Sequence, residues 1–331
     1  MVRKILAVGA ILLFSQLLSA KEAFNPLVLF QGEVEPGSYL YRIERGISRF
    51  EESTNIMVAR KHLIRDNSLY IQELKESATS GYNPIIVQDS NSITNFEEIA
   101  KSYPSTRFIS LDVAYDVPNV LGLTFNHAEG AYVIGYAAGL KSKTNKVGFI
   151  GGMTIPVIEN FQCGYELGVK DANKNVMVSV DYINKGAFSW DDVETAQKLT
   201  QVMLDGDVDV VFPVAGFASK AVMETMKTSG TGGYSFGIDY NYNQQYPETL
   251  IASFEKRADK AIFAALMLLN NDIWNSNEKH FGIKQEIINI AINHDNPTLT
   301  KAEIKKINDL IVQLKGNNSA VTHKISMLCQ M

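Results

Sequence analysis

The sequence contains little cysteine or histidine and has no large excess of charge. Its 331 residues include only two cysteines and five histidines, and the formal net charge is −5. No C-x-x-C motif occurs and the histidines are scattered, so we predict neither a metal site nor a disulfide-rich scaffold. Because nucleic-acid phosphates are bound by clustered basic residues, an acidic chain is not expected to bind nucleic acid. We accordingly expect no metal, no other cofactor and no nucleic-acid partner.

The two cysteines, Cys163 and Cys329, allow a single disulfide bond. Cys329 lies in residues 320–331, a C-terminal stretch without a convincing place in the fold. We therefore interpret this stretch as a tail. The expectation that follows is a small, buried Cys163 and an incidental Cys329, with a bridge between them as the alternative.

The N-terminus has the pattern of an export signal. Arg3 and Lys4 precede an apolar stretch that runs from residue 5 to residue 18. Its about 14 residues would rise only about 21 Å as a helix, less than the roughly 30 Å hydrocarbon core of a bilayer. We predict a signal peptide over residues 1–20, cleaved near Ala20, and a periplasmic protein. No cysteine stands near the cut, so we expect no lipid anchor and a freely diffusing monomer.

Beyond this signal, short apolar segments alternate with amphipathic ones along the whole chain. The expected strands are Leu27–Phe30, Ile85–Gln88, Phe108–Asp112, Val120–Thr124, Lys146–Ile150, Val178–Ile183, Val208–Val214, Tyr234–Asp239, Leu250–Ser253 and Ile287–Ile292. The expected helices are Tyr39–Ser53, Leu69–Ser80, Asn95–Ser102, Ala128–Leu140, Val157–Asn173, Asp192–Asp205, Ala218–Ser229, Ala258–Asn270 and Lys301–Lys315. This alternation predicts an α/β protein with parallel sheets covered on both faces. The roughly 310 residues that follow the predicted signal peptide are more than a single hydrophobic core usually includes, which favours two lobes.

Polar residues and glycines gather where several of these strands end. Asp112 ends one strand and Asp239 another, while residues 212–216 and Gly151-Gly152 follow two more. In open parallel sheets, ligands bind beyond the carboxyl ends of the strands. The sequence therefore predicts a ligand cleft near these positions.

One block of the sequence is specific enough to compare with a known family. It consists of Glu129–Gly139, Lys141–Gly152 and Pro156–Lys170. Shorter motifs follow in the same order, namely Gly186–Asp192, Val214–Gly216, Gly237–Asp239 and Ser253–Arg257. Over about residues 25–315 the chain resembles the basic membrane protein family of substrate-binding proteins, which includes the purine nucleoside receptors of bacterial ABC importers.

The resemblance implies a type I periplasmic-binding-protein fold. In that fold two doubly wound, parallel-sheet lobes are joined by three crossings and enclose a central ligand cleft. We expect residues 24–124 with about 241–285 to form the N-terminal lobe, and residues 125–240 with about 286–316 to form the C-terminal lobe.

The resemblance also implies a set of ligand-binding residues. Asp239 and Lys256 match family positions that grip a sugar, and Gly216 matches a close approach of the backbone to the ligand. Aromatic faces would sandwich a base, and a carboxylate would accept bonds from vicinal hydroxyls. The alternatives are an ion pair between Asp239 and Lys256, a simple turn at Gly216, and aromatic rings that serve only the core. The full set of expected ligand-binding residues is Ser38, Tyr39, Asp112, Phe188, Trp190, Phe212, Gly216, Asp239 and Lys256.

The chain departs from the nucleoside receptors at two motifs. The segment Glu35–Leu40 keeps a hydroxyl at Ser38 and an aromatic ring at Tyr39, but Leu40 replaces an amide. A later Asp-x-Asp-Gln-like pattern becomes Asp-Tyr-Asn-Tyr. Because recognition of a base edge depends on paired polar groups, another nucleoside, a modified base or an unrelated polar solute remains an alternative ligand.

The sequence lacks the motifs of common enzyme classes. No G-x-S-x-G, H-E-x-x-H or dinucleotide-binding motif occurs. Asp191 and Asp192 precede an expected helix, where carboxylates cap free N–H groups, with acid–base chemistry as the alternative. We predict no catalytic residues and no enzymatic activity.

The function that these observations favour is capture of a small, nucleoside-like solute between two lobes and its delivery to the permease of an ABC importer. The alternatives are a periplasmic receptor that senses a different small molecule, and a surface antigen that binds matrix.

Overall fold

The structure, a computed structural model, describes residues 24–88, 93–293, 295–317 and 319–329. The predicted signal peptide lies outside the described residues. Within them, no helix is both long and apolar enough to cross a membrane.

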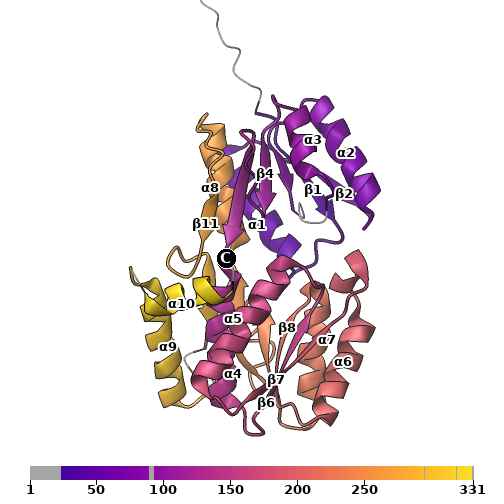
Figure 1. The fold of residues 1–331 in the computed structure, drawn as a ribbon. Helices are drawn as coiled ribbons and strands as arrows, with labels where there is room; N and C mark the ends of the chain where they lie inside the picture. Colours follow the sequence, from indigo (N-terminus) through magenta and orange to yellow (C-terminus); the bar gives the residue numbers. More distant parts are fainter. Residues whose placement is uncertain (1–23, 89–92, 294, 318, 330–331) are drawn as a thin grey trace, which may run out of the picture.

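The described strands form two six-stranded sheets, one in each lobe (Figure 1). The first sheet is parallel and has the order β11-β5-β4-β3-β1-β2. The second has the order β12-β10-β9-β8-β6-β7 and is parallel except for β12. The strands are β1 (Leu27–Gln31), β2 (Ala59–Leu63), β3 (Ile85–Val87), β4 (Phe108–Leu111), β5 (Val120–Phe125), β6 (Lys146–Gly151), β7 (Met177–Tyr182), β8 (Val210–Val214), β9 (Tyr234–Ile238), β10 (Leu250–Lys256), β11 (Lys279–Phe281) and β12 (Ile288–Ala291). The predicted α/β fold of the type I periplasmic-binding-protein class is confirmed.

Helices flank both sheets. Those of the first lobe are α1 (Tyr39–Thr54), α2 (Asn67–Thr79), α3 (Phe96–Ser102) and α8 (Ala258–Asn270). Those of the second lobe are α4 (His127–Lys141), α5 (Pro156–Ala172), α6 (Val193–Asp205), α7 (Ser219–Thr228), α9 (Lys301–Lys315) and α10 (Ala320–Leu328), with the short 3-10 helices η2 (Gly186–Trp190) and η3 (Gly216–Ala218).

Each sheet is buried on both faces because alternate side chains of a strand enter different cores. In β1, Val28 and Phe30 pack into one core cluster, whereas Leu27 and Leu29 pack into another. Successive side chains of a strand point to opposite faces, so a strand covered on both sides reads as a continuous apolar run. This is why the strands could be predicted from short runs of Val, Ile, Leu and Phe.

The edge strand β2 escaped prediction because its sequence, Ala59-Arg-Lys-His-Leu63, is largely polar. Arg60 is bound by two carboxylates of α1, with Nη2 2.7 Å from Glu44 Oε1 and Nη1 in contact with Glu51 Oε1. Burial opposes the charge of Arg60, but these two partners outweigh it and raise its pKa. The ion pairs thus replace apolar burial as the means by which this strand is fixed to the lobe.

The chain passes between the lobes three times. It crosses after β5, after β10, and between β11 and β12, as the membership of the two sheets requires. The second passage corrects our expectation: β10 belongs to the sheet of the second lobe, so the chain leaves that lobe after Lys256 and not near residue 241. Sequence could not place this passage, because a buried strand has the same apolar pattern in either sheet.

Helices α4 and α5 approach closely through glycines. A Cβ at Gly168 would lie 2.0 Å from the carbonyl oxygen of Tyr132, and one at Gly135 would lie 2.0 Å from that of Tyr165. Neither distance is possible between real atoms, so the two backbones touch only because these residues have no side chain. Gly135 and Gly168, both in the resemblance block, therefore serve helix packing.

Replacing Gly168 by alanine should destabilise the protein by about 3 kcal/mol, because an added methyl group forces α4 and α5 apart. Urea unfolding followed by circular dichroism would measure the change. The matched control is Gly206→Ala at the end of α6, where the nearest atom to a new Cβ is 3.3 Å away and φ is −86°. We expect that variant to unfold within about 0.5 kcal/mol of the wild type. Equal effects of the two substitutions would contradict the packing argument.

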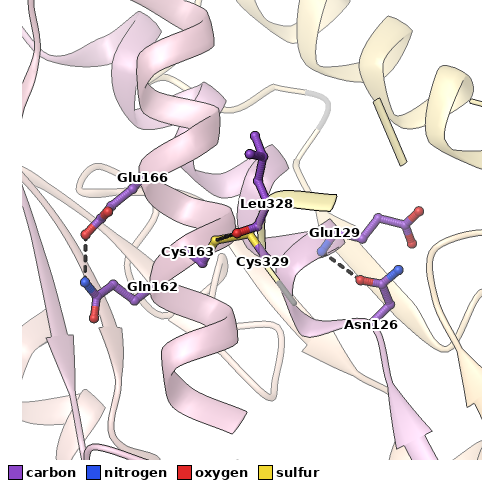
Figure 2. The surroundings of a disulfide bond; sticks show 7 residues. All are labelled: Asn126, Glu129, Gln162, Cys163, Glu166, Leu328 and Cys329. Atoms are coloured by element: carbon purple, nitrogen blue, oxygen red, sulfur yellow. Dashed lines mark hydrogen bonds between the residues drawn. A yellow bond between two sulfur atoms is a disulfide. The ribbon is translucent and has the colours of Figure 1, made fainter. Parts of the chain in front are cut away.

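The C-terminal residues are part of the fold, and the interpretation of residues 320–331 as a tail is wrong for the described part. Residues 320–328 form α10, which packs against α4, α5 and α9. Cys163 on α5 and Cys329 at the end of α10 are joined by a disulfide bond (Figure 2). The expectation of an incidental Cys329 is therefore corrected. The pairing depends on two helices meeting in space, which spacing along the sequence does not reveal.

Candidate ligand-binding site

A cavity of about 440 Å³ lies between the two lobes. The carboxyl ends of strands from both sheets open toward it, as expected for parallel sheets. Its lining residues are Gln31, Glu33, Glu35, Ser38, Tyr39, Leu40, Arg65, Gln88, Leu111, Asp112, Ile155, Val157, Ile158, Phe161, Trp190, Asp191, Val214, Gly216, Phe217, Ile238, Asp239 and Lys256.

Two aspartates from opposite lobes reach the cavity from similar turns. Asp112 directly follows β4 in the first lobe, and Asp239 directly follows β9 in the second. Both have left-handed backbones, with φ of 69° and 62°. Aspartate tolerates this conformation better than most side chains. The turn ends the strand at once and places each carboxylate at the cleft.

Asp112 is held ionised by a lysine from the other lobe. Lys256, which is only 4% exposed at the end of β10, places Nζ 2.5 Å from Asp112 Oδ1. The hydroxyl of Tyr39 donates to Asp112 Oδ2 at 3.0 Å. Burial opposes ionisation of Asp112, but Lys256 and His127 together outweigh it and hold the pKa of Asp112 well below its usual range. Beneath this pair, burial and then Lys256 lower the pKa of His127 to about 4, so His127 is neutral at pH 7.

The carboxylate of Asp239 forms no hydrogen bond or ion pair with any described residue. Lys256 is the partner of Asp112, so the ion pair between Asp239 and Lys256 that we held as an alternative is not formed. Only the backbone oxygen of Asp239 is bound, by Arg42 Nε at 3.0 Å. Burial raises the pKa of Asp239 to about 6, against the opposing charge of Lys256. Asp239 is half-buried at the cavity wall, and donors from a ligand would offset the desolvation of its unpaired carboxylate.

Four aromatic side chains line the cavity: Tyr39 on α1, Phe161 on α5, Trp190 on η2 and Phe217 on η3. Two aromatic residues that we expected at the ligand do not line it. Phe212 is fully buried in the core, where its ring packs with those of Phe149, Phe161, Tyr165 and Phe236. Phe188 is 66% exposed on the outside of η2. Of the residues of β8, Val214 at the strand's end lines the cavity, whereas Phe212 lies two positions earlier and is covered by the core. A sequence pattern does not show how far from the strand's end the cavity reaches.

Trp190 is positioned by glycines. A Cβ at Gly152 would lie 2.5 Å from Trp190 Cζ3, and one at Gly216 would lie 3.3 Å from Trp190 Cβ. Gly216 also has a φ of 58°, which favours glycine. Gly216 thus packs against Trp190, and Gly152 leaves room for the indole at the cavity wall. The approach of the Gly216 backbone to a ligand stays a prediction.

Seven of the nine expected residues line the cavity: Ser38, Tyr39, Asp112, Trp190, Gly216, Asp239 and Lys256. Ser38 also caps α1, where its Oγ accepts from the amide of Tyr41 at 3.2 Å.

Sequence reasoning missed two amide side chains at the first lobe's wall. Gln31 ends β1 and Gln88 follows β3, and both line the cavity. Their amide groups line the same cavity as Leu40, the residue that replaces an amide of the nucleoside receptors' motif. Their signal was their place at strand ends, the same feature that singled out Asp112.

The cavity has an excess of negative charge. Among the described residues, its lining carboxylates number five and its cations two, which leaves three carboxylates in excess: Glu33, Glu35, Asp112, Asp191 and Asp239 against Arg65 and Lys256. Within the described residues no cluster of His, Cys, Asp or Glu could hold a metal ion. The arrangement suits a neutral or cationic solute with hydrogen-bond donors and a flat apolar part.

Comparison with known proteins gives consistent results. The family model described as "ABC transporter substrate-binding protein PnrA-like" matches residues 25–321. Basic membrane protein A2 of Borrelia garinii is 27% identical over 289 residues, which cover 84% of this chain and 82% of that protein. Among solved structures, an ABC transporter solute-binding protein from Aeropyrum pernix superposes with a TM-score of 0.73 at 21% identity, over 93% of this chain and 90% of that one. The 5-methylthioribose transporter solute-binding protein from Thermotoga lettingae, in complex with 5-methylthioribose, gives a TM-score of 0.64 at 12% identity, over 92% and 96%.

Proposed function

The chain belongs to the PnrA-like family of ABC transporter substrate-binding proteins, and on that basis we propose that it captures a nucleoside between its lobes and delivers it to an ABC importer. The family is one of binding proteins and not of enzymes, as we predicted. We further propose that the exported protein acts in the periplasm as a monomer.

The observation that carries this proposal is the half-buried carboxylate of Asp239, which lies at the cavity wall and has no partner among the described residues. A ribose presents two adjacent hydroxyl donors, and one carboxylate can accept both through charge-assisted bonds. Lys256, already bound to Asp112, has donors left for a ring or hydroxyl oxygen. A solute without adjacent donors would leave the desolvation cost of Asp239 unrelieved.

The other walls suit the rest of a nucleoside. Trp190 and Phe161 offer apolar aromatic faces to a base, and Gln31 and Gln88 offer amide groups to its polar edge. The volume of about 440 Å³ falls within the range of small-molecule sites. Because carboxylates outnumber cations, a phosphorylated nucleoside should be repelled.

A ligand screen tests the proposal. Thermal shift followed by calorimetry would compare purine and pyrimidine nucleosides, free bases, ribose, nucleotides and amino acids. A ligand that binds only the folded state raises the melting temperature. We expect nucleosides to stabilise the protein and their monophosphates to do so far less. Stabilisation by amino acids or sugars alone would contradict the assignment of a nucleoside.

Affinity for the nucleoside should fall as the pH drops below about 6. Asp239 titrates with a pKa of about 6 in the free protein, and a ligand that donates to the carboxylate binds its ionised form. Protonation therefore competes with binding, and the dissociation constant should rise by up to about tenfold per pH unit below that pKa. Calorimetry between pH 7 and pH 5 would measure the trend. Asp112 and His127 titrate below this window. A flat profile would show that the ligand does not engage the Asp239 carboxylate.

A further inference from the structure

An ion pair at the wall of the cavity connects the two lobes. Arg65 Nε lies 2.7 Å from Asp191 Oδ2, and both residues line the cavity. Arg65 belongs to the first lobe, between β2 and α2, whereas Asp191 belongs to the second, just after η2. The pair can therefore exist only while the lobes are closed.

The topology places this pair on the side of the cleft away from the crossings. The chain crosses at β5, β10, β11 and β12, which form one end of each sheet. Arg65 follows β2 and Asp191 lies between β7 and α6, and these two strands form the opposite ends. Because a hinge motion separates the parts farthest from the crossings most, opening breaks this contact first.

Contacts within the first lobe already restrain the side chain of Arg65, so that it points toward the second lobe. Its guanidinium lies over Gly32, where a Cβ would be 2.6 Å from Arg65 Nη2, and its side chain is only 14% exposed. Gly32 has a φ of 110°, so that turn favours glycine. A side chain restrained in this way loses little conformational freedom when it binds Asp191.

Two hydrogen bonds from the second lobe to backbone carbonyl groups lie nearer to α1. The Tyr242 hydroxyl donates to the carbonyl oxygen of Gly37 at 2.7 Å, and Lys220 Nζ donates to that of Pro36 at 3.0 Å. These bonds do not depend on a pair of opposite charges. The positive and negative charges of the Arg65–Asp191 pair can therefore be exchanged between the two positions without altering the carboxylate of Asp239.

We propose that Arg65 and Asp191 form an electrostatic latch that favours the closed state and regulates how tightly and how long the solute is held. This inference rests on the proposed function, namely binding by closure of the lobes. When a ligand binds only the closed state, its apparent affinity falls in proportion to the fraction of the protein that is closed. The latch therefore acts on affinity without a hydrogen bond to the solute.

Charge reversal tests the latch. Arg65→Asp and Asp191→Arg each place like charges across the cleft, and we expect each to weaken nucleoside affinity by about tenfold, chiefly through faster release. The double swap, R65D with D191R, should restore most of the affinity. High salt should weaken binding by the wild type and the swap. As the matched control, the swap K146D with D207K reverses an ion pair of 3.0 Å at the far end of the second lobe, and should leave affinity unchanged.

Small-angle X-ray scattering of the ligand-free protein gives a readout that needs no ligand. The single variants should be more extended than the wild type, and the double swap should match it. If adenosine and uridine, used as probes, fail to bind the wild type while scattering follows this order, the nucleoside assignment fails and the latch stands. If the double swap is as open and as weak as the single variants, or if all variants scatter alike, the latch is overturned.

Discussion

Replacement of Asp239 by alanine is expected to weaken nucleoside binding by about tenfold to 150-fold, which corresponds to about 1.5–3 kcal/mol for a hydrogen bond to a charged group. The effect should be large because no described residue hydrogen-bonds to this carboxylate or pairs with it, and two ligand hydroxyls would share it. Titration calorimetry with a nucleoside found in the screen would measure the change.

The variant Asp239→Asn separates loss of binding from loss of folding. It keeps the shape of the side chain and removes a carboxylate whose pKa is raised by burial to about 6. A carboxyl group with a raised pKa in the folded state contributes stability at low pH, and that contribution is lost as the pH rises through about 6. The contribution is complete only below the pKa of about 4 that the group has in the unfolded chain, so the asparagine variant should match the wild type near about pH 3 and be more stable at pH 8, while it still binds poorly. Wild-type affinity in either variant would remove Asp239 from the site.

Removal of the disulfide bond should lower the free energy of unfolding by about 2–5 kcal/mol, because the bond closes a long loop of chain in the unfolded state. Cys163 and Cys329 are 166 residues apart, and the loop includes most of the second lobe. The variant with both cysteines replaced by alanine would be compared with the wild type by urea unfolding. The wild type unfolded in the presence of a reductant should match that variant.

The helix that the disulfide holds has weaker contacts that provide a control. Lys324 of α10 binds Asp171 of α5 through an exposed ion pair of 2.5 Å, and the Thr322 hydroxyl donates to Glu129 at 3.2 Å. Such an ion pair contributes about 0–1 kcal/mol, so Lys324→Ala should have a small effect. If the loss of both cysteines costs no more than Lys324→Ala, the bond does not stabilise the fold.

The C-terminal helix also lies beside two of the crossings. Glu129 accepts a bond from Thr322 of α10 and another, at 2.9 Å, from the amide of Ile283 between β11 and β12. The amide of Glu129 in turn donates to Asn126 Oδ1 at 3.0 Å, just after the first crossing (Figure 2). The disulfide thus holds α10 against the segments that join the lobes.

Much of this architecture could be predicted from the sequence because its causes are local. Continuous apolar runs such as Val210–Val214 are the mark of a strand buried on both faces, and the order of strands and helices indicates parallel sheets. In such sheets the strand ends converge on the ligand, which is why Asp112 and Asp239 could be selected without a structure. The elements that escaped, β2, β11 and α10, are polar, short or amphipathic, and they are fixed by partners distant in the sequence.

What only the tertiary structure decided is which distant groups become partners. The sequence determined two lobes, a cleft at the strand ends, and the presence there of Asp112, Asp239 and Lys256. It did not determine that Lys256 would pair with Asp112 and leave the carboxylate of Asp239 without a partner in the described part of the chain. Nor did it determine that Arg65 would meet Asp191, or that the two cysteines would join. Strand and helix patterns follow from neighbours along the chain, whereas each of these pairings depends on how two separately formed units meet in space.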